Sequence, residues 1–372
     1  MPAHLQKSRR RQMSLRAYVR SLRKGPVLAA GIIVVVVIAA VVTLVVTQNN
    51  GPRATSGRKQ TAATPPSKNC PLTGLPAPGG AAPQREPLAV KIGNEVAARP
   101  QSGLNEADVV YDTPAEGGIQ RYLAVFQCND ASEVGPIRSV RWIDWHVLEV
   151  FSHAELAYAG GIQPNQSAIA SLPFIDNANE FVRYGAYHQN PNRTMPDATY
   201  SSTSALWKLF PARPVPQPIF TYTASLPTGA KPASALAINF SQGTDVIWKW
   251  DPSTGLWVHT YAGTTDVDAL TGQPVSTTNI IVQVVRYSLG PYNEDPQAHS
   301  GDVESQTVGT GSGWVLRNGK EIAVTWHRAS LTSRTTYTSV GGQSVGLQPG
   351  RTWVEFVLDT TAKLPGAITI TP

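Results

Sequence analysis

The chain has 372 residues, 41% of them hydrophobic and 15% charged, which is enough for one or two folded domains with additional segments. The formal net charge of +6 is unevenly placed, because the first 68 residues hold 12 of the 31 basic residues and none of the 25 acidic ones. The remainder is therefore net acidic, so the positive total does not indicate nucleic-acid binding, and no nucleic-acid partner is expected.

An apolar segment near the N-terminus predicts a membrane anchor. Residues 26–46 contain no charged side chain, and 21 residues of helix span about 30 Å, the thickness of a bilayer core. Basic residues are concentrated before this segment, so the positive-inside rule predicts a basic cytoplasmic tail at 1–25 and folded domains outside the cell membrane. We expect a single-pass transmembrane signal anchor at 26–47. The rival interpretation is a cleaved signal peptide, although the apolar run is longer than that class usually has.

The next part of the chain predicts a spacer and then an α/β domain. Residues 48–84 are rich in Gly, Pro, Ala, Ser and Thr, which predicts a flexible extracytoplasmic linker. Strand patterns follow at 87–94, 108–114 and 119–127, a short strand is expected at 137–140, and a largely buried helix at 141–151 precedes a strand at 154–158. Strands that alternate with helical segments predict an N-terminal α/β domain at 85–215.

A proline-rich segment separates this half from a second one. Residues 211–232 hold six prolines, which indicates a linker or an extended crossover. Short strands at hairpin spacing then run from residue 235 to 358, and the Asn318-Gly319 step is a strong hairpin signal. The predicted fold class is therefore mixed α+β: an N-terminal α/β domain and a β-rich C-terminal domain at 233–362, preceded by one transmembrane helix.

Two cysteines, Cys70 and Cys128, are the only ones in the chain. Outside the membrane the compartment permits disulfides, and an exposed free thiol is a liability there. We expect a disulfide between them that joins the start of the folded region to the end of a strand. The alternative is two unpaired thiols.

An arginine cluster is the most distinctive chemical feature of the first half. Arg138 and Arg141 flank a predicted strand-to-helix turn, and Arg121 lies on a neighbouring strand. Guanidinium groups grip phosphate or carboxylate with two donors, so these residues are candidates for an anion-binding site. In the alternative interpretation they form a semi-buried network with carboxylates. The carboxylate partners, or base candidates if the site is catalytic, are Asp112, Glu116 and Asp144.

No motif for a metal or a cofactor is present in the sequence. The pairs His-x-His and His-x-x-x-His and the motif Cys-x-x-Cys are missing, and His146, His153 and His188 are read as packed or surface side chains. No predicted strand-to-helix turn carries a Gly-x-Ser-x-Gly nucleophile elbow, since the match at Gly342–Gly346 lies in the hairpin-rich second half, and this argues against a serine hydrolase of that class. We therefore expect no metal and no cofactor, and catalytic residues stay unassigned.

Taken together, the motifs resemble the YerB-like family, bacterial proteins of unknown function that are described as lipoproteins with an N-terminal and a C-terminal part. The resemblance rests on "CPLTGLPA", "RPQSGLNEADVVYDTPAEGGIQRYLAVFQ" and "VGPIRSVR" in the first half, and on "TTNIIVQ", "GTGSGWVLRNGK", "TWHR" and "PGRTWVEF" in the second. It covers about residues 70–360. Two departures stand out: a membrane helix replaces the lipidated cysteine, and Asp197-Ala198 in "RTMPDATY" replaces a His-Asn pair.

The resemblance implies that the chain is related to this family, and the family itself has no established activity. The favoured interpretation is a membrane-anchored extracytoplasmic protein that binds an anionic cell-wall or lipid-linked ligand through Arg121, Arg138 and Arg141. One alternative is an envelope enzyme that acts on a phosphate-containing glycan or lipid intermediate. The other is a structural factor in cell-envelope assembly.

Overall fold

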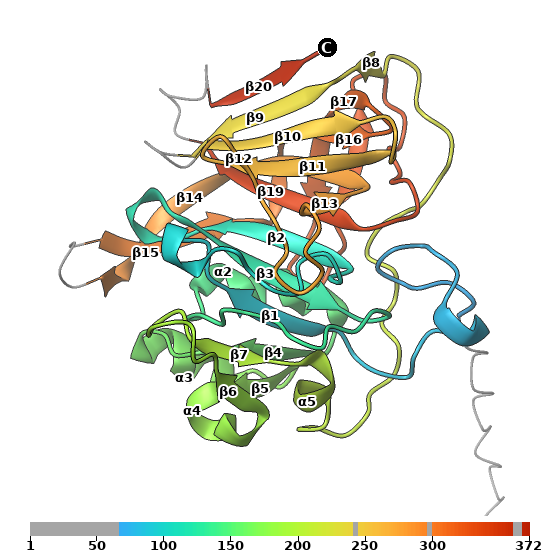
Figure 1. The fold of residues 1–372 in the computed structure, drawn as a ribbon. Coiled ribbons are helices and arrows are strands. Elements are labelled where there is room, and N and C mark those ends of the chain that lie inside the picture. The colour runs from blue at the N-terminus through green and yellow to red at the C-terminus, as the bar shows by residue number, and fades with distance from the viewer. Residues whose placement is uncertain (1–66, 241–244, 296–299, 360–366) are drawn as a thin grey trace, which may run out of the picture. The chain divides into compact units, whose positions relative to one another are not determined.

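The computed structural model describes residues 67–240, 245–295, 300–359 and 367–372 (Figure 1). The predicted cytoplasmic tail at 1–25, the predicted anchor at 26–47 and residues 48–66 of the predicted linker lie outside these ranges. Among the helices inside them, none is both long and apolar enough to cross a bilayer.

The first half contributes five strands to one sheet. They are β1 (Leu88–Ile92), β2 (Val109–Pro114), β3 (Gln120–Phe126), β4 (Ala154–Tyr158) and β5 (Ile175–Asn179). Both β1 and β2 pair antiparallel with β3, while β4 is parallel to β1 and β5 is parallel to β4. Consequently β1, β2, β4 and β5 point the same way, and their carboxyl ends reach one edge of the sheet.

Short helices and one small hairpin connect these strands. The α-helices are α2 (Trp142–Leu148), α3 (Gln163–Ser171), α4 (Glu180–Arg183) and α5 (Thr203–Trp207). The 3-10 turns are η2 (Pro78–Gly80), η3 (Val96–Ala98), η4 (Glu116–Gly118), η5 (Glu149–Phe151) and η6 (Tyr184–Ala186), and the hairpin joins β6 (Tyr187–Gln189) to β7 (Thr199–Ser201). The expected helix at 141–151 is thus α2 followed by η5. The expected strand at 137–140 is only an extended segment, in which Ile137 forms an isolated bridge with Ile92.

The second half is made of strands. They are β8 (Lys231–Pro232), β9 (Ala235–Asn239), β10 (Asp245–Asp251), β11 (Leu256–Tyr261), β12 (Thr264–Thr265), β13 (Ser276–Thr277), β14 (Asn279–Asp295), β15 (Ser300–Gln306), β16 (Gly309–Arg317), β17 (Lys320–Arg328), β18 (Thr336–Ser339), β19 (Thr352–Leu358) and β20 (Ile368–Thr371). The predicted hairpin at Asn318-Gly319 is confirmed, since it joins β16 to β17 with Arg317 opposite Lys320.

The two halves share a single sheet, so the prediction of an α/β domain followed by a β-rich domain is wrong. β19 pairs in parallel with β2, from Thr352 opposite Val109 to Glu355 opposite Asp112 (Figure 1). The resulting twelve-stranded mixed sheet has the order β18-β17-β16-β14-β19-β2-β3-β1-β4-β5, with β15 beside β14 and β8 beside β17. The physical reason is that a buried strand edge must pair its backbone N–H and C=O groups, and β2 and β19 provide these partners for each other. The described chain is therefore mostly β.

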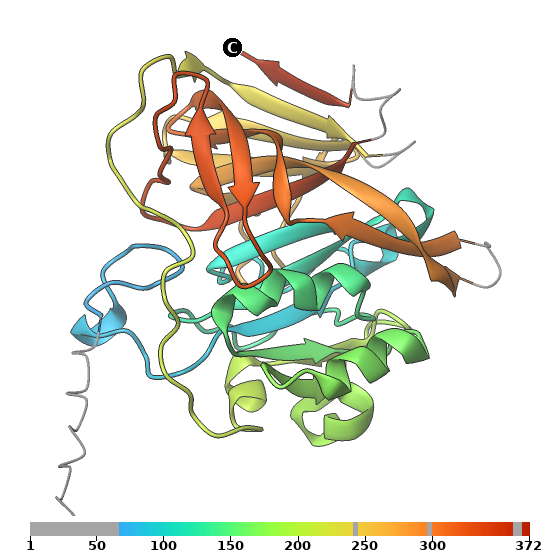
Figure 2. The same ribbon diagram turned by 180° about the vertical axis from the view of Figure 1, so that it is seen from behind.

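Both faces of this sheet are covered. On one face, α2 and α3 pack over apolar residues from both halves, including Leu123, Ile281 and Phe356 (Figure 2). On the other face lie α5 and a second sheet with the order β12-β11-β10-β9-β20, whose Trp248 packs edge-on against Trp353 of β19. The core therefore runs through both halves, which explains why strands such as β1, β2 and β3 are buried along their whole length.

Candidate functional site

The three arginines singled out in the sequence lie at the sheet edge where the carboxyl ends of β1, β2 and β4 meet. Arg121 on β3 is the register partner of Thr113, near the end of β2. The backbone N–H of Arg138 donates to the carbonyl of Lys91 on β1, and Arg141 directly precedes α2. In sheets of parallel strands this edge is the usual place for a ligand. The structure thus brings the three anion-binding candidates together.

Arg141 is held by Glu116, which follows the end of β2. Its Nε donates to Glu116 Oε2 at 2.6 Å, and a second hydrogen bond joins its Nη2 to Oε1. Burial by itself would raise the pKa of Glu116, but the hydrogen bonds and charge of Arg141, with the charge of Arg121, lower it to about 2. Glu294 of β14 adds a contact of 3.5 Å to Arg141 Nη1, because the β14–β15 hairpin packs back on α2 and η4. Arg141 is therefore firmly paired.

Arg121 is held more loosely. Its Nη2 lies 3.4 Å from both Glu95 Oε1 and Glu116 Oε1, and its Nη1 donates to the carbonyl of Ser139 at 3.3 Å. Burial, and then the charge of Arg141, lower the pKa of Arg121 to about 10. A buried guanidinium with long contacts to two shared carboxylates retains much of its capacity to bind another anion.

Arg138 occupies the end of the group that solvent reaches. Its Nη2 lies 2.8 Å from Glu95 Oε1, and its Nη1 lies 3.1 Å from Asp197 Oδ1. Glu95 is the most exposed of these side chains at 26%, and the charges of Arg121 and Arg138 lower its pKa despite its burial. A Cβ atom on Gly93 would lie 2.8 Å from Cγ of Arg138, so a glycine there gives the arginine room to pass over the backbone. We call these seven side chains the arginine network: Arg121, Arg138, Arg141, Glu95, Glu116, Asp197 and Glu294.

Asp144, a predicted partner or base, caps α2. Its Oδ2 accepts a hydrogen bond of 2.7 Å from the backbone N–H of Arg141, and its Oδ1 lies 2.7 Å from Nζ of Lys91. It therefore contacts the backbone of Arg141 and the ammonium group of Lys91 in place of a guanidinium.

Asp112, the third predicted carboxylate, lies opposite another acid. It faces Glu355 across the β2–β19 pairing, and both side chains are fully buried. Burial and the neighbouring Glu355 raise the pKa of Asp112 well above its usual range, and burial raises the pKa of Glu355 to about 7. Glu355 Oε1 accepts a hydrogen bond of 2.7 Å from the indole of Trp248. The two acids hold at least one proton between them at neutral pH.

Three exposed apolar side chains lie on segments that neighbour the arginine network. Val96 is 76% exposed and follows Glu95, while Met195 is 63% exposed and lies two residues before Asp197. Arg193 joins these two segments, because it donates to the carbonyls of Ala97, Arg99 and Pro100. Phe181 is 71% exposed and lies beside Gly160 and Ser139. We call Val96, Phe181 and Met195 the apolar rim.

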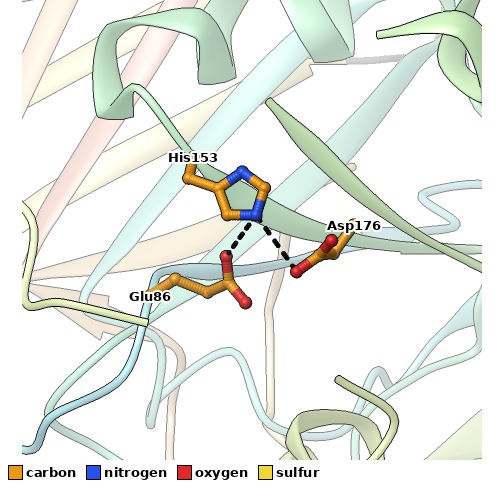
Figure 3. A group of neighbouring side chains, drawn as sticks. All are labelled: Glu86, His153 and Asp176. Carbon is orange, nitrogen blue, oxygen red and sulfur yellow. Dashed lines mark hydrogen bonds and ion pairs between the residues drawn. The ribbon is translucent and has the colours of Figure 1, made fainter. Parts of the chain in front are cut away.

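A second polar group lies elsewhere in the first half (Figure 3). The imidazole Nε2 of His153 is 3.5 Å from Glu86 Oε2 and 3.2 Å from Asp176 Oδ2. These three residues could hold a metal ion, since their ligand atoms all lie within 4.8 Å of one another. Burial, and then the charges of Glu86 and Asp176, raise the pKa of the adjacent Glu155 to about 9. Sequence spacing did not indicate this group, because its members come from three separate segments.

The predicted disulfide is confirmed. Cys70 and Cys128 are bonded across 58 residues of sequence, and both are buried. The bond joins the start of the described chain to Cys128, two residues after the end of β3.

Several residues of the arginine network were not among the site candidates predicted from the sequence. Glu95 and Asp197 are far from the arginines in sequence and belong to no motif that points to a site. The one available signal was Asp197 itself, which stands where the family resemblance expects a different residue, and which the structure places against Arg138.

Comparisons with known proteins show the family of this chain. Residues 72–215 match the N-terminal domain and residues 236–354 the C-terminal domain of the family described as "Protein of unknown function (DUF3048)". The chain is 27% identical over 304 residues to the "Putative lipoprotein YerB" of Bacillus subtilis (strain 168), covering 78% of this chain and 87% of that protein. A crystal structure of the YerB protein from Bacillus subtilis has the same fold, with a TM-score of 0.71 at 23% identity over 82% of this chain and 100% of that one. The chain therefore belongs to the DUF3048 family, which confirms the YerB-like resemblance.

Proposed function

We propose that this chain is an extracytoplasmic envelope protein, tethered to the membrane by residues 26–47, and that its arginine network binds an anionic group of a cell-wall or lipid-linked ligand. The membrane location is supported by the name of the relative, "Putative lipoprotein YerB", and by the apolar segment of this chain. The two proteins would then reach the same surface by different anchors.

One observation carries the binding proposal: a single carboxylate oxygen serves two arginines at the open end of the network. Glu95 Oε1 lies 2.8 Å from Arg138 and 3.4 Å from Arg121. A phosphate group brings more negative charge and three acceptor oxygens, so it can give each guanidinium its own short hydrogen bonds. Glu95 is partly exposed and can turn outward when such a group enters.

The apolar rim favours a ligand that is both anionic and apolar. Val96, Phe181 and Met195 each leave most of their surface in water on segments next to the network. Burying that surface against a hydrocarbon chain contributes about 25 cal/mol per Å² of apolar area. A polyprenyl phosphate or pyrophosphate has both features, so we favour this class of ligand over free phosphate.

Calorimetric titration of the full chain in detergent tests the proposal. The probes are inorganic pyrophosphate and a polyprenyl pyrophosphate in the same micelles. Arg138→Ala should weaken binding of both by roughly tenfold to a hundredfold, the usual effect of losing a hydrogen bond to a charged group. Glu95→Gln should strengthen binding of both, because it removes the competing charge and keeps the side-chain shape.

Arg334→Ala is the matched control, since Arg334 is an exposed arginine of the second half. It should leave both affinities unchanged. Equal binding by wild type and Arg138→Ala would place the anion elsewhere. No binding by any variant, Glu95→Gln included, would leave the network with a purely structural role.

A further inference from the structure

The group of Glu86, His153 and Asp176, here called the carboxylate–histidine cluster, lies at the amino ends of three strands. Glu86 comes two residues before β1, His153 directly before β4, and Asp176 is the second residue of β5. These three strands are neighbours in the sheet and run parallel. The cluster is therefore at the opposite ends of the strands from the arginine network.

The geometry of the cluster matches the inner shell of a metal ion. In tetrahedral or octahedral sites with bonds of about 2.0–2.2 Å, neighbouring ligand atoms lie about 3.0–3.5 Å apart. His153 Nε2 is 3.2 Å from Asp176 Oδ2 and 3.5 Å from Glu86 Oε2 (Figure 3). One imidazole nitrogen aimed between two carboxylate oxygens is a ligand set typical of divalent transition metals.

A third acidic side chain, next to the cluster, has no hydrogen-bond partner among the described residues. Glu155 is fully buried, and neither of its carboxylate oxygens accepts a hydrogen bond there. It is the register partner of Asp176, so these two side chains project from the same face of the sheet, and it lies two residues after His153. Glu86 Oε2 is likewise buried and accepts no hydrogen bond. A buried polar group without a hydrogen-bond partner is costly, and a cation beside these oxygens would remove that cost.

Carboxyl groups also outnumber guanidinium groups in this region. Beside the three carboxyl groups of Glu86, Glu155 and Asp176 lies Arg213, which contacts Glu86 and Asp176. Arg213 is 39% exposed and donates to both oxygens of Asp176. It can keep its bond to Oδ1 while Oδ2 binds a metal, which is how outer partners commonly orient metal-binding carboxylates.

We propose that Glu86, His153 and Asp176 bind one divalent transition-metal ion of the Zn²⁺ or Mn²⁺ class, with Glu155 as an additional carboxylate beside it. Three protein ligands leave at least one coordination position for water or a substrate. The 20% exposure of His153 and the 14% exposure of Asp176 give an ion access from solvent. This site does not depend on the proposed function of the arginine network.

Metal retention by the untagged full chain in detergent tests the site. The protein is stripped with a chelator, incubated with ZnCl₂ or MnCl₂, dialysed, and measured by elemental mass spectrometry. We expect one ion per wild-type chain. His153→Gln and Asp176→Asn should each lower the affinity at least tenfold, and Co²⁺ should give visible absorption bands that His153→Gln removes.

Two control variants make the result specific. His188→Gln removes a histidine that is 52% exposed and contacts one carboxylate, and it should retain the ion. Arg138→Ala should also retain it, because Arg138 lies at the other end of the strands.

A further variant tests the additional carboxylate. Glu155→Gln keeps the shape of the side chain and should weaken metal binding by about tenfold.

Equal retention by wild type, His153→Gln and Glu155→Gln would overturn the proposal, and so would the absence of a bound ion from folded wild-type protein. Circular dichroism of each variant shows whether it is folded. If His153→Gln does not fold, the comparison rests on Glu155→Gln and Asp176→Asn.

Discussion

The ammonium group of Lys91 lies 2.7 Å from a carboxylate oxygen of Asp144, and neither side chain has any exposed surface. Lys91 also donates to the hydroxyl of Thr113 at 2.7 Å. Burial lowers the pKa of Lys91, while the charge of Asp144 acts in the opposite direction. This pair joins β1 and β2 to the first turn of α2, and it thereby fixes the backbone position of Arg141.

Removing either partner of this pair should strongly destabilise the protein. Lys91→Met or Asp144→Ala leaves an unpaired buried charge, which costs about 3–5 kcal/mol of unfolding free energy. The double variant should lose less than the sum of the two, because no unpaired charge remains. Urea unfolding followed by tryptophan fluorescence measures this, with Lys249→Met, an exposed lysine, as the control. Additive losses would contradict a direct coupling.

The stability of the protein should fall as the pH rises from about 4.5 to 7, in part because of Asp112 and Glu355. Burial raises the pKa of Glu355 from 4.5 to about 7, so the folded state keeps a proton that the unfolded chain has lost. The unfolding free energy then decreases by about 1 kcal/mol for each pH unit and each such proton. The charges of Arg99 and Lys91 act in the opposite direction on the pKa of Asp112. The hydrogen bond from the indole of Trp248 does the same for the pKa of Glu355.

Variants separate this pair from the other acids. The double variant Asp112→Asn with Glu355→Gln should show a smaller pH slope than wild type in denaturation measured at pH 5, 6, 7 and 8. Glu355→Gln alone should remove part of the difference, since burial still raises the pKa of Asp112. An unchanged slope in the double variant would show that the pair does not share a proton.

The apolar rim should matter for a lipid-linked ligand and not for a free anion. Val96→Asn and Met195→Gln together should weaken binding of a polyprenyl pyrophosphate by roughly tenfold, because less apolar surface is buried. Binding of inorganic pyrophosphate should stay the same. Val340→Asn changes a valine that is 90% exposed in the second half and serves as the control. Equal losses for both probes would indicate a disturbed arginine network.

The disulfide should make a measurable contribution to stability. Replacing Cys70 and Cys128 together by serine should lower the unfolding free energy by about 2–4 kcal/mol, since the bond closes a long loop in the unfolded chain. Reducing agent should have the same effect on wild type and none on the variant. A wild-type protein insensitive to reduction would show that the bond adds little.

Local sequence patterns were sufficient for most individual elements. Alternating or continuous apolar runs predicted β1, β2, β3 and β4, and the Asn318-Gly319 turn predicted the β16–β17 hairpin. These features depend on neighbouring residues, so a sequence can encode them directly. The same holds for the cysteine pair, because only one pairing was possible.

The pairing of β2 with β19 had no comparable signal. More than 240 residues separate Val109 from Thr352, and each strand looks the same in sequence whether its neighbour comes from its own half or from the other. Two predicted domains therefore became one sheet.

By itself, the sequence determined most of the strands, the Asn318-Gly319 hairpin, the disulfide, the family and the nearness of Arg138 to Arg141, because each follows from local spacing or from a motif. The tertiary structure alone decided which carboxylates those arginines meet. It places Glu95 and Asp197 beside Arg138, and Asp112 opposite Glu355. It also places Glu86, His153 and Asp176 together at the amino ends of three strands. The physical reason is that charge pairing depends on distance in space, and strand order in the sheet sets that distance.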